Sequence, residues 1–250
     1  MSFVSRAGAL GVVLIAVLDG SPIGARIVTR HDRADSLYLA AGARFSAVAR
    51  VGRAGDGTLI APRWVLTAGH VAAGVGPQAQ VLLGGRTYGI ARKVVHPDWR
   101  ELGPHDVGLI ELVEDVIDVE PLPLYEGDDE KGRVAMLVGH GDTRTGRGGE
   151  WVRDGMRRAA TNRVDAAGEG RLVFTFDEPP GGTDLEGAPG RGDSGGPALL
   201  EIEGRWHVAG VSSAGFDGRH GPGTYGAVDH FTRVSSYVEW IRAQMGSLPK

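Results

Sequence analysis

The stretch APGRGDSGGPALL, residues 188–200, places one serine among four glycines and ahead of an apolar run. A serine hydroxyl is a weak nucleophile at neutral pH until a neighbouring base takes its proton. If Ser194 attacks a carbonyl, backbone N–H groups must also converge on the oxyanion, which requires unusual backbone dihedrals. Gly192, Gly195 and Gly196 supply that freedom, because glycine adopts positive φ without steric cost. The stretch therefore predicts a nucleophilic serine.

The base that such a serine requires is an imidazole, which in turn needs an acceptor to fix its tautomer. His70 ends the segment LTAGH, and Asp106 opens the apolar segment DVGLIEL. His70, Asp106 and Ser194 are separated by 36 and 88 residues and follow one of the known orders of Ser-His-Asp triads. Taken alone, each is more simply a structural histidine, a turn acid or a glycine-rich turn. Found together in this order, they predict catalysis.

Four blocks carry a family resemblance. WVLTAGH, HDVGLIEL, GDSGGP and FTRVSSYVEWI (231–241) occur in the order found in the chymotrypsin-like (trypsin-like) serine proteases, which this chain resembles from about residue 45 to 243. The resemblance implies that His70 is the general base and then the general acid, that Asp106 orients it, and that Ser194 is the nucleophile. It also implies an oxyanion hole made by the N–H groups of Gly192 and Ser194.

Asp193 precedes the nucleophile, and in the resembled family this Asp pairs with a newly freed N-terminal ammonium. The segment GARIVTR offers such a terminus, since cleavage after Arg26 would free Ile27. The family usually continues with two glycines, whereas Thr29 and Arg30 follow here. We therefore predict activation through Ile27 and Asp193. Backbone donors or Arg191 are the alternative partners of the Asp193 carboxylate, because a buried acid needs one.

The specificity pocket departs from the trypsin-like pattern. The residue six positions before the nucleophile binds Lys or Arg in trypsin-like members, and here it is Ala188. Alignment of DHFTRV places Asp229 where a pocket glycine is usual, so its carboxylate either attracts a basic side chain or fills the pocket. We favour a basic residue before the scissile bond (P1) over a neutral pocket. Ser213 and Gly215 resemble the backbone-binding segment, in which Ala214 replaces a usual Trp and predicts a wider subsite.

The elements that must position these residues are mostly strands. Short apolar runs separated by Gly, Pro and Asp clusters are typical of an all-β sandwich or barrel. The resemblance narrows this to two six-stranded antiparallel β-barrels, over about residues 27–125 and 134–234, with the triad in the cleft between them. The proline- and charge-rich segment 121–133 predicts the crossover. The apolar face of SSYVEWIRAQM predicts a C-terminal helix over 235–245.

Composition sets further limits. The chain has 250 residues, a net charge of −4 and 42% hydrophobic residues, which suits a globular protein and indicates neither nucleic acid nor an anionic membrane as partner. It has no cysteine, which excludes disulfides, thiolate catalysis and Cys-ligated zinc. Members of the resembled family usually carry several disulfides. Packing must therefore position this triad, and an error of about 1 Å would reduce the rate roughly a hundredfold.

The N-terminal segment predicts a secreted protein. Arg6 precedes an apolar run over residues 7–18, which is too short to span a bilayer but fits a signal peptide. We assign residues 1–26 to a signal peptide with a short pro-segment and residues 27–250 to a peptidase domain. A buried N-terminal strand or helix is the alternative. After removal of the signal we expect an extracellular monomer without membrane association.

Two functions from different classes are compatible with these residues. The first is a secreted serine endopeptidase, with polypeptide as substrate and a protein inhibitor as a second candidate partner. The alternative is a catalytically weak, protease-like binding module. A metallohydrolase is a third idea, but the eight histidines lack the His-Glu-x-x-His spacing. We predict no metal and no cofactor.

Overall fold

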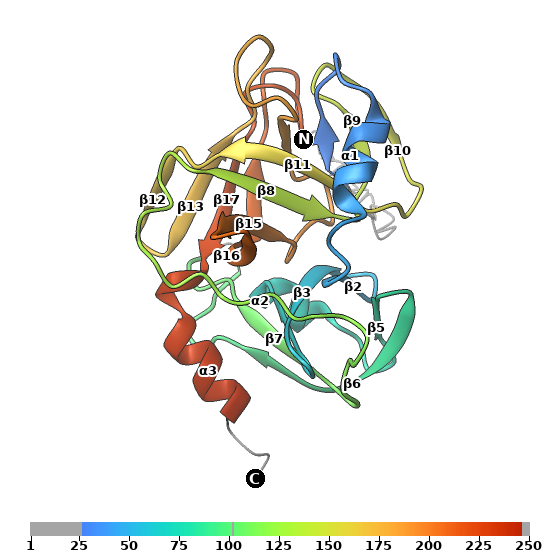
Figure 1. The fold of residues 1–250 in the computed structure, drawn as a ribbon, viewed down its shortest axis with the longest axis vertical. Helices are drawn as coiled ribbons and strands as arrows, with labels where there is room; N and C mark the ends of the chain where they lie inside the picture. Colours follow the sequence, from blue (N-terminus) through green and yellow to red (C-terminus); the bar gives the residue numbers. More distant parts are fainter. Residues whose placement is uncertain (1–26, 102, 247–250) are drawn as a thin grey trace, which may run out of the picture.

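The computed structural model describes residues 27–101 and 103–246. Figure 1 shows two β-units stacked end to end, the earlier part of the chain forming most of the lower unit and the later part the upper one. The predicted signal peptide and pro-segment, residues 1–26, lie outside the described residues. The predicted all-β class with two barrel-like halves and a C-terminal helix is confirmed, although the halves differ in closure.

The first unit is a closed six-stranded barrel in the order β2-β3-β4-β7-β6-β5. Its strands are β2 (Val48–Val51), β3 (Gly55–Ala61), β4 (Trp64–Thr67), β5 (Gln80–Leu83), β6 (Arg86–Val95) and β7 (Gly108–Leu112). All four residues of β4 are buried, and this strand is hydrogen-bonded in the barrel wall to β3 on one side and β7 on the other. A side chain at Gly57 would place its Cβ 2.6 Å from Val65, so the close packing of β3 on β4 requires glycine there.

The second unit is a seven-stranded sheet in the order β11-β8-β15-β16-β17-β13-β12, curled into a half-barrel. Its strands are β8 (Val134–Gly139), β11 (Arg158–Arg163), β12 (Ala166–Gly168), β13 (Arg171–Thr175), β15 (Pro197–Ile202), β16 (Arg205–Phe216) and β17 (Val228–Arg233). The sheet does not close because the outer edge of β11 bonds elsewhere. There the Thr161 N–H donates to the Leu185 carbonyl at 2.8 Å.

A small sheet joins the start of the described chain to the second unit. It has the order β10-β9-β1-β14 and consists of β1 (Val28–Thr29), β9 (Thr143–Thr145), β10 (Gly148–Val152) and β14 (Gly187–Ala188). Val28 pairs with Ala188, so the residues just after Ile27 lie against the segment that leads to Ser194.

Helices are few and short. The predicted helix over 235–245 is found as a 3₁₀ turn, η1 (Val234–Ser236), followed by α3 (Val238–Gly246). In Figure 1 α3 descends beside the first barrel, and Val238 and Ile241 belong to the core cluster that fills that barrel. Two further helices, α1 (Asp35–Gly42) and α2 (Gly69–Gly74), were not predicted. Within the described part of the chain, every helix falls short of the length and apolarity that a bilayer crossing demands.

Candidate active site

His70 and Asp106 are joined by two hydrogen bonds. The backbone N–H of His70 donates to Asp106 Oδ1 at 2.9 Å, and His70 Nδ1 lies 2.8 Å from Asp106 Oδ2. The Ser213 hydroxyl donates to the same Oδ2 at 2.6 Å. The Asp106 side chain is 7% exposed and that of His70 is 35% exposed, so the acid is buried behind an imidazole that reaches solvent. The Asp106 carboxylate thus fixes His70 at two points, the backbone N–H and the ring Nδ1, and so sets the orientation of the imidazole.

The protonation state of Asp106 follows from these bonds. Burial acts to raise the pKa of Asp106, but hydrogen bonds from His70 and Ser213 and the attraction of His70 outweigh it, so the pKa lies below its ordinary value. Asp106 is therefore ionised at neutral pH. An ionised acceptor at Nδ1 keeps the proton of neutral His70 on that nitrogen and leaves Nε2 with a free lone pair, which is the state a general base requires.

Two glycines bring the His70 segment against Asp106. A Cβ on Gly69 would lie 3.1 Å from Asp106 Oδ1, and a Cβ on Gly108 would lie 2.8 Å from Ala72. Gly69 begins α2 and Gly108 begins β7, so the small residues let the helix that carries His70 pack on the strand that follows Asp106. The segment LTAGH therefore needs its glycine for a close approach.

Ser194 lies on a loop that is bonded to both units. Its carbonyl accepts a hydrogen bond from the Asp56 N–H of β3 at 2.8 Å, and the next N–H, that of Gly195, donates to the Ser212 carbonyl at 2.8 Å. Gly195 has φ +82°, and a Cβ there would lie 2.2 Å from Thr67 Oγ1 and 3.1 Å from the Ala68 N. The nucleophile loop is thus pressed against the residues that immediately precede His70.

The backbone N–H groups expected to form the oxyanion hole are available. Gly192 has φ +84°, and among the described residues neither its N–H nor that of Ser194 donates a hydrogen bond. No hydrogen bond joins Ser194 to His70 within the same part of the chain, which is common in substrate-free active sites, where such bonds tighten on binding. The arrangement offers two backbone donors beside a serine hydroxyl.

A cavity of about 320 Å³ opens beside Ser194. The residues lining it that matter below are Gly192, Ser194, Ser213, Gly215, Asp229 and Trp151. Three of the four residues predicted to bind substrate therefore reach this cavity. The fourth, Ala188, does not, because it is fully buried in β14, where it pairs with β1. The lining begins one residue later, at Pro189.

Asp229, near the start of β17, lies opposite Gly215 of the neighbouring strand β16. The two residues pair between β17 and β16, and a Cβ on Gly215 would lie 2.6 Å from Asp229 Oδ1. Asp229 is 6% exposed, and burial raises its pKa to about 8. The cavity therefore contains a carboxyl group that gains or loses its proton near neutral pH.

A second cavity, of about 450 Å³, lies on the other side of His70. Its apolar lining includes Trp99, Ala214 and Phe216, and the Phe216 ring packs edge-on against His230 with centroids 4.9 Å apart. Ala214, where the sequence predicts a wider subsite, is among the residues that line this cavity.

Comparisons with known proteins agree with this geometry. The family model described as Trypsin matches residues 40–241. The chain belongs to the trypsin family. It is 27% identical over 228 residues to complement C1r-B subcomponent of Mus musculus, and 30% identical over 239 residues to complement C1s subcomponent of Sus scrofa, covering 77% of this chain in each case. The matches cover 31% and 32% of those relatives, so the chain spans about a third of their length.

A solved structure gives the same fold. Neuropsin, a serine protease expressed in the limbic system of mouse brain, superposes with a TM-score of 0.64 at 21% identity, over 82% of this chain and 96% of that one. The trypsin-family chain therefore has the fold of a serine protease, with its hydrogen-bonded histidine and acid beside the nucleophile loop.

Asp193 has backbone partners in this trypsin-family chain. Its carboxylate accepts hydrogen bonds from the Gly141 N–H at 2.9 Å and the Gly190 N–H at 2.8 Å. Burial, followed by the neighbouring Asp56 carboxylate, raises its pKa well above the ordinary value. These donors are one of the two alternatives to the Ile27 ammonium. Ile27 itself is 1% exposed, and its carbonyl accepts a bond from the Thr143 hydroxyl.

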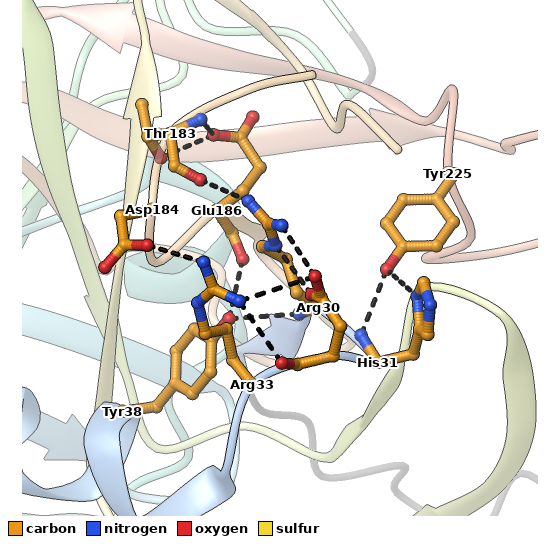
Figure 2. A network of polar contacts seen from close by, with 9 residues as sticks. Arg30, His31, Arg33, Tyr38, Thr183, Asp184, Glu186 and Tyr225 are labelled. Atoms are coloured by element: carbon orange, nitrogen blue, oxygen red, sulfur yellow. Dashed lines mark hydrogen bonds and ion pairs between the residues drawn. The ribbon is translucent and has the colours of Figure 1, made fainter. Parts of the chain in front are cut away.

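A polar network fixes the chain that follows Ile27, as Figure 2 shows. Arg30, where the family usually has glycine, is buried, bonds to Asp32 at 2.8 Å and donates to the Thr183 carbonyl at 2.8 Å. The His31 N–H donates to the Tyr225 hydroxyl at 3.0 Å. The departure from the family pattern at Arg30 thus anchors the start of the domain to the segment at Thr183, and His31 adds a contact to Tyr225.

One pair of residues at the site was missed by the sequence analysis. Asp56, 1% exposed, accepts the His140 N–H at 2.7 Å and contacts His140 Nδ1 at 3.1 Å. Asp56 follows β3's first residue and His140 follows β8, so the pair links the two units directly behind Ser194. The sequence GDGT looks like an ordinary acidic turn, and only the topology brings it opposite His140.

Proposed function

We propose that this chain is a serine endopeptidase that cleaves polypeptides through an acyl-enzyme on Ser194. The observation that carries the proposal is the pair of hydrogen bonds between His70 and the Asp106 carboxylate. The Ser213 hydroxyl donates a third hydrogen bond to the same carboxylate. A histidine that is merely structural has no need of a buried, ionised carboxylate at Nδ1, and this carboxylate is held in place by the Ser213 hydroxyl as well. Membership of the trypsin family supports the same assignment.

The proposed reaction has two halves. His70 Nε2 takes the Ser194 proton as the hydroxyl oxygen attacks the scissile carbonyl, and the N–H groups of Gly192 and Ser194 bind the resulting oxyanion. His70 then returns the proton to the leaving amine, which departs as the acyl-enzyme forms. Water then attacks the ester carbonyl while His70 takes its proton, and His70 passes that proton to the Ser194 oxygen as the ester bond breaks and the acid product leaves. Each oxyanion donor is worth about 2.7–4 kcal/mol in the transition state.

We propose a basic residue at P1, with Asp229 as its counter-ion. Asp229 lies in the cavity beside Ser194, and its carboxyl has no hydrogen-bond partner among the described residues. A cationic side chain would compensate the burial that now raises its pKa. Ser213 and Gly215 would bind the substrate backbone, and a protein inhibitor would use the same contacts.

Secretion and activation by cleavage after Arg26 are also proposed. The apolar run at residues 7–18 supports an exported precursor that is released as a monomer. The raised pKa of Asp193 supports activation, because two backbone donors leave its charge without a counter-ion. A free ammonium on Ile27 would supply that charge.

A fluorophosphonate probe tests the assignment, since it reacts only with an activated serine. We expect labelling of the wild-type chain that disappears in Ser194→Ala and persists in Ser46→Ala, an exposed serine outside the site. The alternative function, a catalytically weak binding module, would be supported if the wild-type protein, treated to remove residues 1–26, took up no probe and cleaved no peptide.

A further inference from the structure

Two of the three guanidinium nitrogens of Arg144, on β9, are buried without a hydrogen-bond partner in the described part of the chain. Its Nε and Nη2 atoms are buried and make no hydrogen bond within the described part of the chain, where they are the only such side-chain atoms. The remaining nitrogen, Nη1, makes one long bond of 3.4 Å to the Gly149 carbonyl. A buried guanidinium without acceptors is costly, and each such group in a folded protein calls for an explanation.

The surroundings of Arg144 make an anion the missing partner. Its guanidinium stacks 4.1 Å from the centroid of the Trp151 ring, and the guanidinium of Arg191 lies 5.9 Å from the same centroid. Burial first, and then the charge of Arg191, lower the pKa of Arg144. Two cations that share one aromatic ring repel each other unless an anion lies between or beside them.

The local acid does not fill this role. Asp217 is exposed, and its charge raises the pKa of Arg144 less than Arg191 lowers it. No hydrogen bond or ion pair joins Asp217 to Arg144 or Arg191 among the described residues. The acceptor that Arg144 lacks must therefore come from outside this part of the chain.

The position of the pair identifies the kind of molecule that brings the anion. Trp151 and Arg191 line the same cavity as Ser194 and Asp229, so a polypeptide bound there for cleavage would come within reach of them. Planar guanidinium groups bind carboxylates through paired N–H donors. An indole ring beneath them holds their side chains in place.

We propose that Arg144, Arg191 and the Trp151 ring form a subsite that binds a carboxylate of the polypeptide substrate. The proposal rests on the protease function and adds to it, because it predicts a second specificity determinant besides P1. The carboxylate is either an Asp or Glu side chain near the scissile bond or the C-terminal carboxylate of a short peptide. A substrate with a basic P1 residue and a neighbouring acid would then match both the acidic cavity and its basic rim.

Binding and hydrolysis of matched peptides test this separately. Fluorescein-labelled peptides with Arg at P1 carry Asp or Asn at each position from P3 to P3′, and a second series ends in a free carboxylate or an amide. Affinity is measured by fluorescence anisotropy on Ser194→Ala, and kcat/KM is measured on the wild-type chain. Because a charge-assisted hydrogen bond corresponds to roughly tenfold or more in affinity, we expect at least one acidic peptide to exceed its amide counterpart by that factor.

Variants assign the preference to residues. The preference should fall to less than about threefold when Arg144→Gln or Arg191→Gln is added to the Ser194→Ala chain, since each removes paired donors. It should persist in Arg147→Gln, an exposed arginine of the same hairpin. Thermal melting establishes that each variant folds, and if Arg144→Gln does not, Arg191→Gln decides. If both variants lose the preference for Asp over Asn within the peptide, the subsite binds an acidic side chain. If they lose the preference for a free C-terminal carboxylate over an amide, it binds a chain end.

The outcomes separate the two proposals. If every acidic peptide binds within twofold of its amide, or if the preference survives both substitutions, the carboxylate subsite is wrong whether or not the protein is a protease. If the Ser194→Ala chain retains the preference while the wild-type chain hydrolyses no peptide, the subsite stands and the protease assignment falls.

Discussion

If Asp229 binds the P1 side chain as proposed, its carboxyl group makes substrate preference depend on pH. Its pKa is about 8, compared with 3.8 for an exposed Asp, because the side chain is buried at the inner end of the cavity. A difference of about 4 pKa units corresponds to about 6 kcal/mol against ionising the group in the folded chain. A P1 Arg needs the ionised form, whereas an uncharged P1 side chain such as Met does not.

The ratio of kcat/KM for an Arg substrate to that for a matched Met substrate isolates this step, because any pH dependence of the chemical steps that the two substrates share cancels in the ratio. With a pKa of about 8, Asp229 is about 9% ionised at pH 7 and about 90% ionised at pH 9. We expect the ratio to rise about tenfold over that interval and to level off above it. The P1 Arg itself stays protonated throughout, since its pKa exceeds 12.

Asp229→Asn should make the ratio low and independent of pH, since the amide neither ionises nor attracts a cation. The substitution also has a signature in stability. The folded wild-type chain retains the Asp229 proton up to about pH 8, while the unfolded chain loses it near 3.8, so ionisation of Asp229 destabilises the folded state increasingly as pH rises through this interval. The melting temperature of Asp229→Asn should therefore gain on the wild type between pH 5 and pH 9.

A ratio that stays constant in the wild-type chain from pH 6 to pH 9 would refute the role of Asp229 in binding P1. An Arg preference that survives in Asp229→Asn would refute it as well, and would indicate a second anion in the cavity. Peptides that differ only at P1 and carry no other charged residue provide the matched pair.

Three further results are expected. Ser213→Ala should lower kcat/KM roughly tenfold in steady-state assays, because it removes a hydrogen bond to the ionised Asp106. His140→Ala should destabilise the fold by about 1–3 kcal/mol in urea unfolding, since it removes the side-chain contact to the buried Asp56 but keeps the backbone bond, whereas His140→Gln, which keeps a side-chain donor, should lose less. Arg26→Gln should leave purified precursor at least about tenfold less active after mild trypsin treatment than the treated wild type; equal activity would mean that backbone donors suffice for the nucleophile loop.

The parts that the sequence could predict are those in which chemistry restricts the residue type. A strand class follows from short apolar runs between turns, and the family follows from blocks around a serine, a histidine and an acid whose roles tolerate few substitutes. The cavity residues Ser213 and Gly215 were found from the segment SSAG, and Asp229 was found by aligning DHFTRV. Ala188 was placed by counting back from Ser194, and counting cannot tell that β14 turns this side chain away from the cavity.

Other features depend on partners that are distant in the sequence. Helix α1 has no side-chain N-cap and buries only Tyr38 and Gly42, so its local pattern is weak and its packing on β11 decides its conformation. The predicted helix starts at 235, whereas α3 starts at Val238, because the chain first makes a 3₁₀ turn as it leaves β17. The unpartnered Arg144 could not be recognised either, since burial of a guanidinium is a property of the folded hairpin.

The absence of cysteine raised the question of what holds the nucleophile loop in place, and Asp56 provides the answer. Its N–H binds the Ser194 carbonyl, its own carbonyl accepts the Thr67 hydroxyl at 2.6 Å three residues before His70, and its carboxylate bonds to His140 across the two units. Asp56 is thus hydrogen-bonded to Ser194, to Thr67 of the strand β4 that precedes His70, and to His140 of the second unit. Hydrogen bonds of this kind, each worth about 1 kcal/mol or more when buried, constrain the separation of His70 and Ser194 from both sides, so a rigid catalytic geometry does not require the disulfides that related chains use.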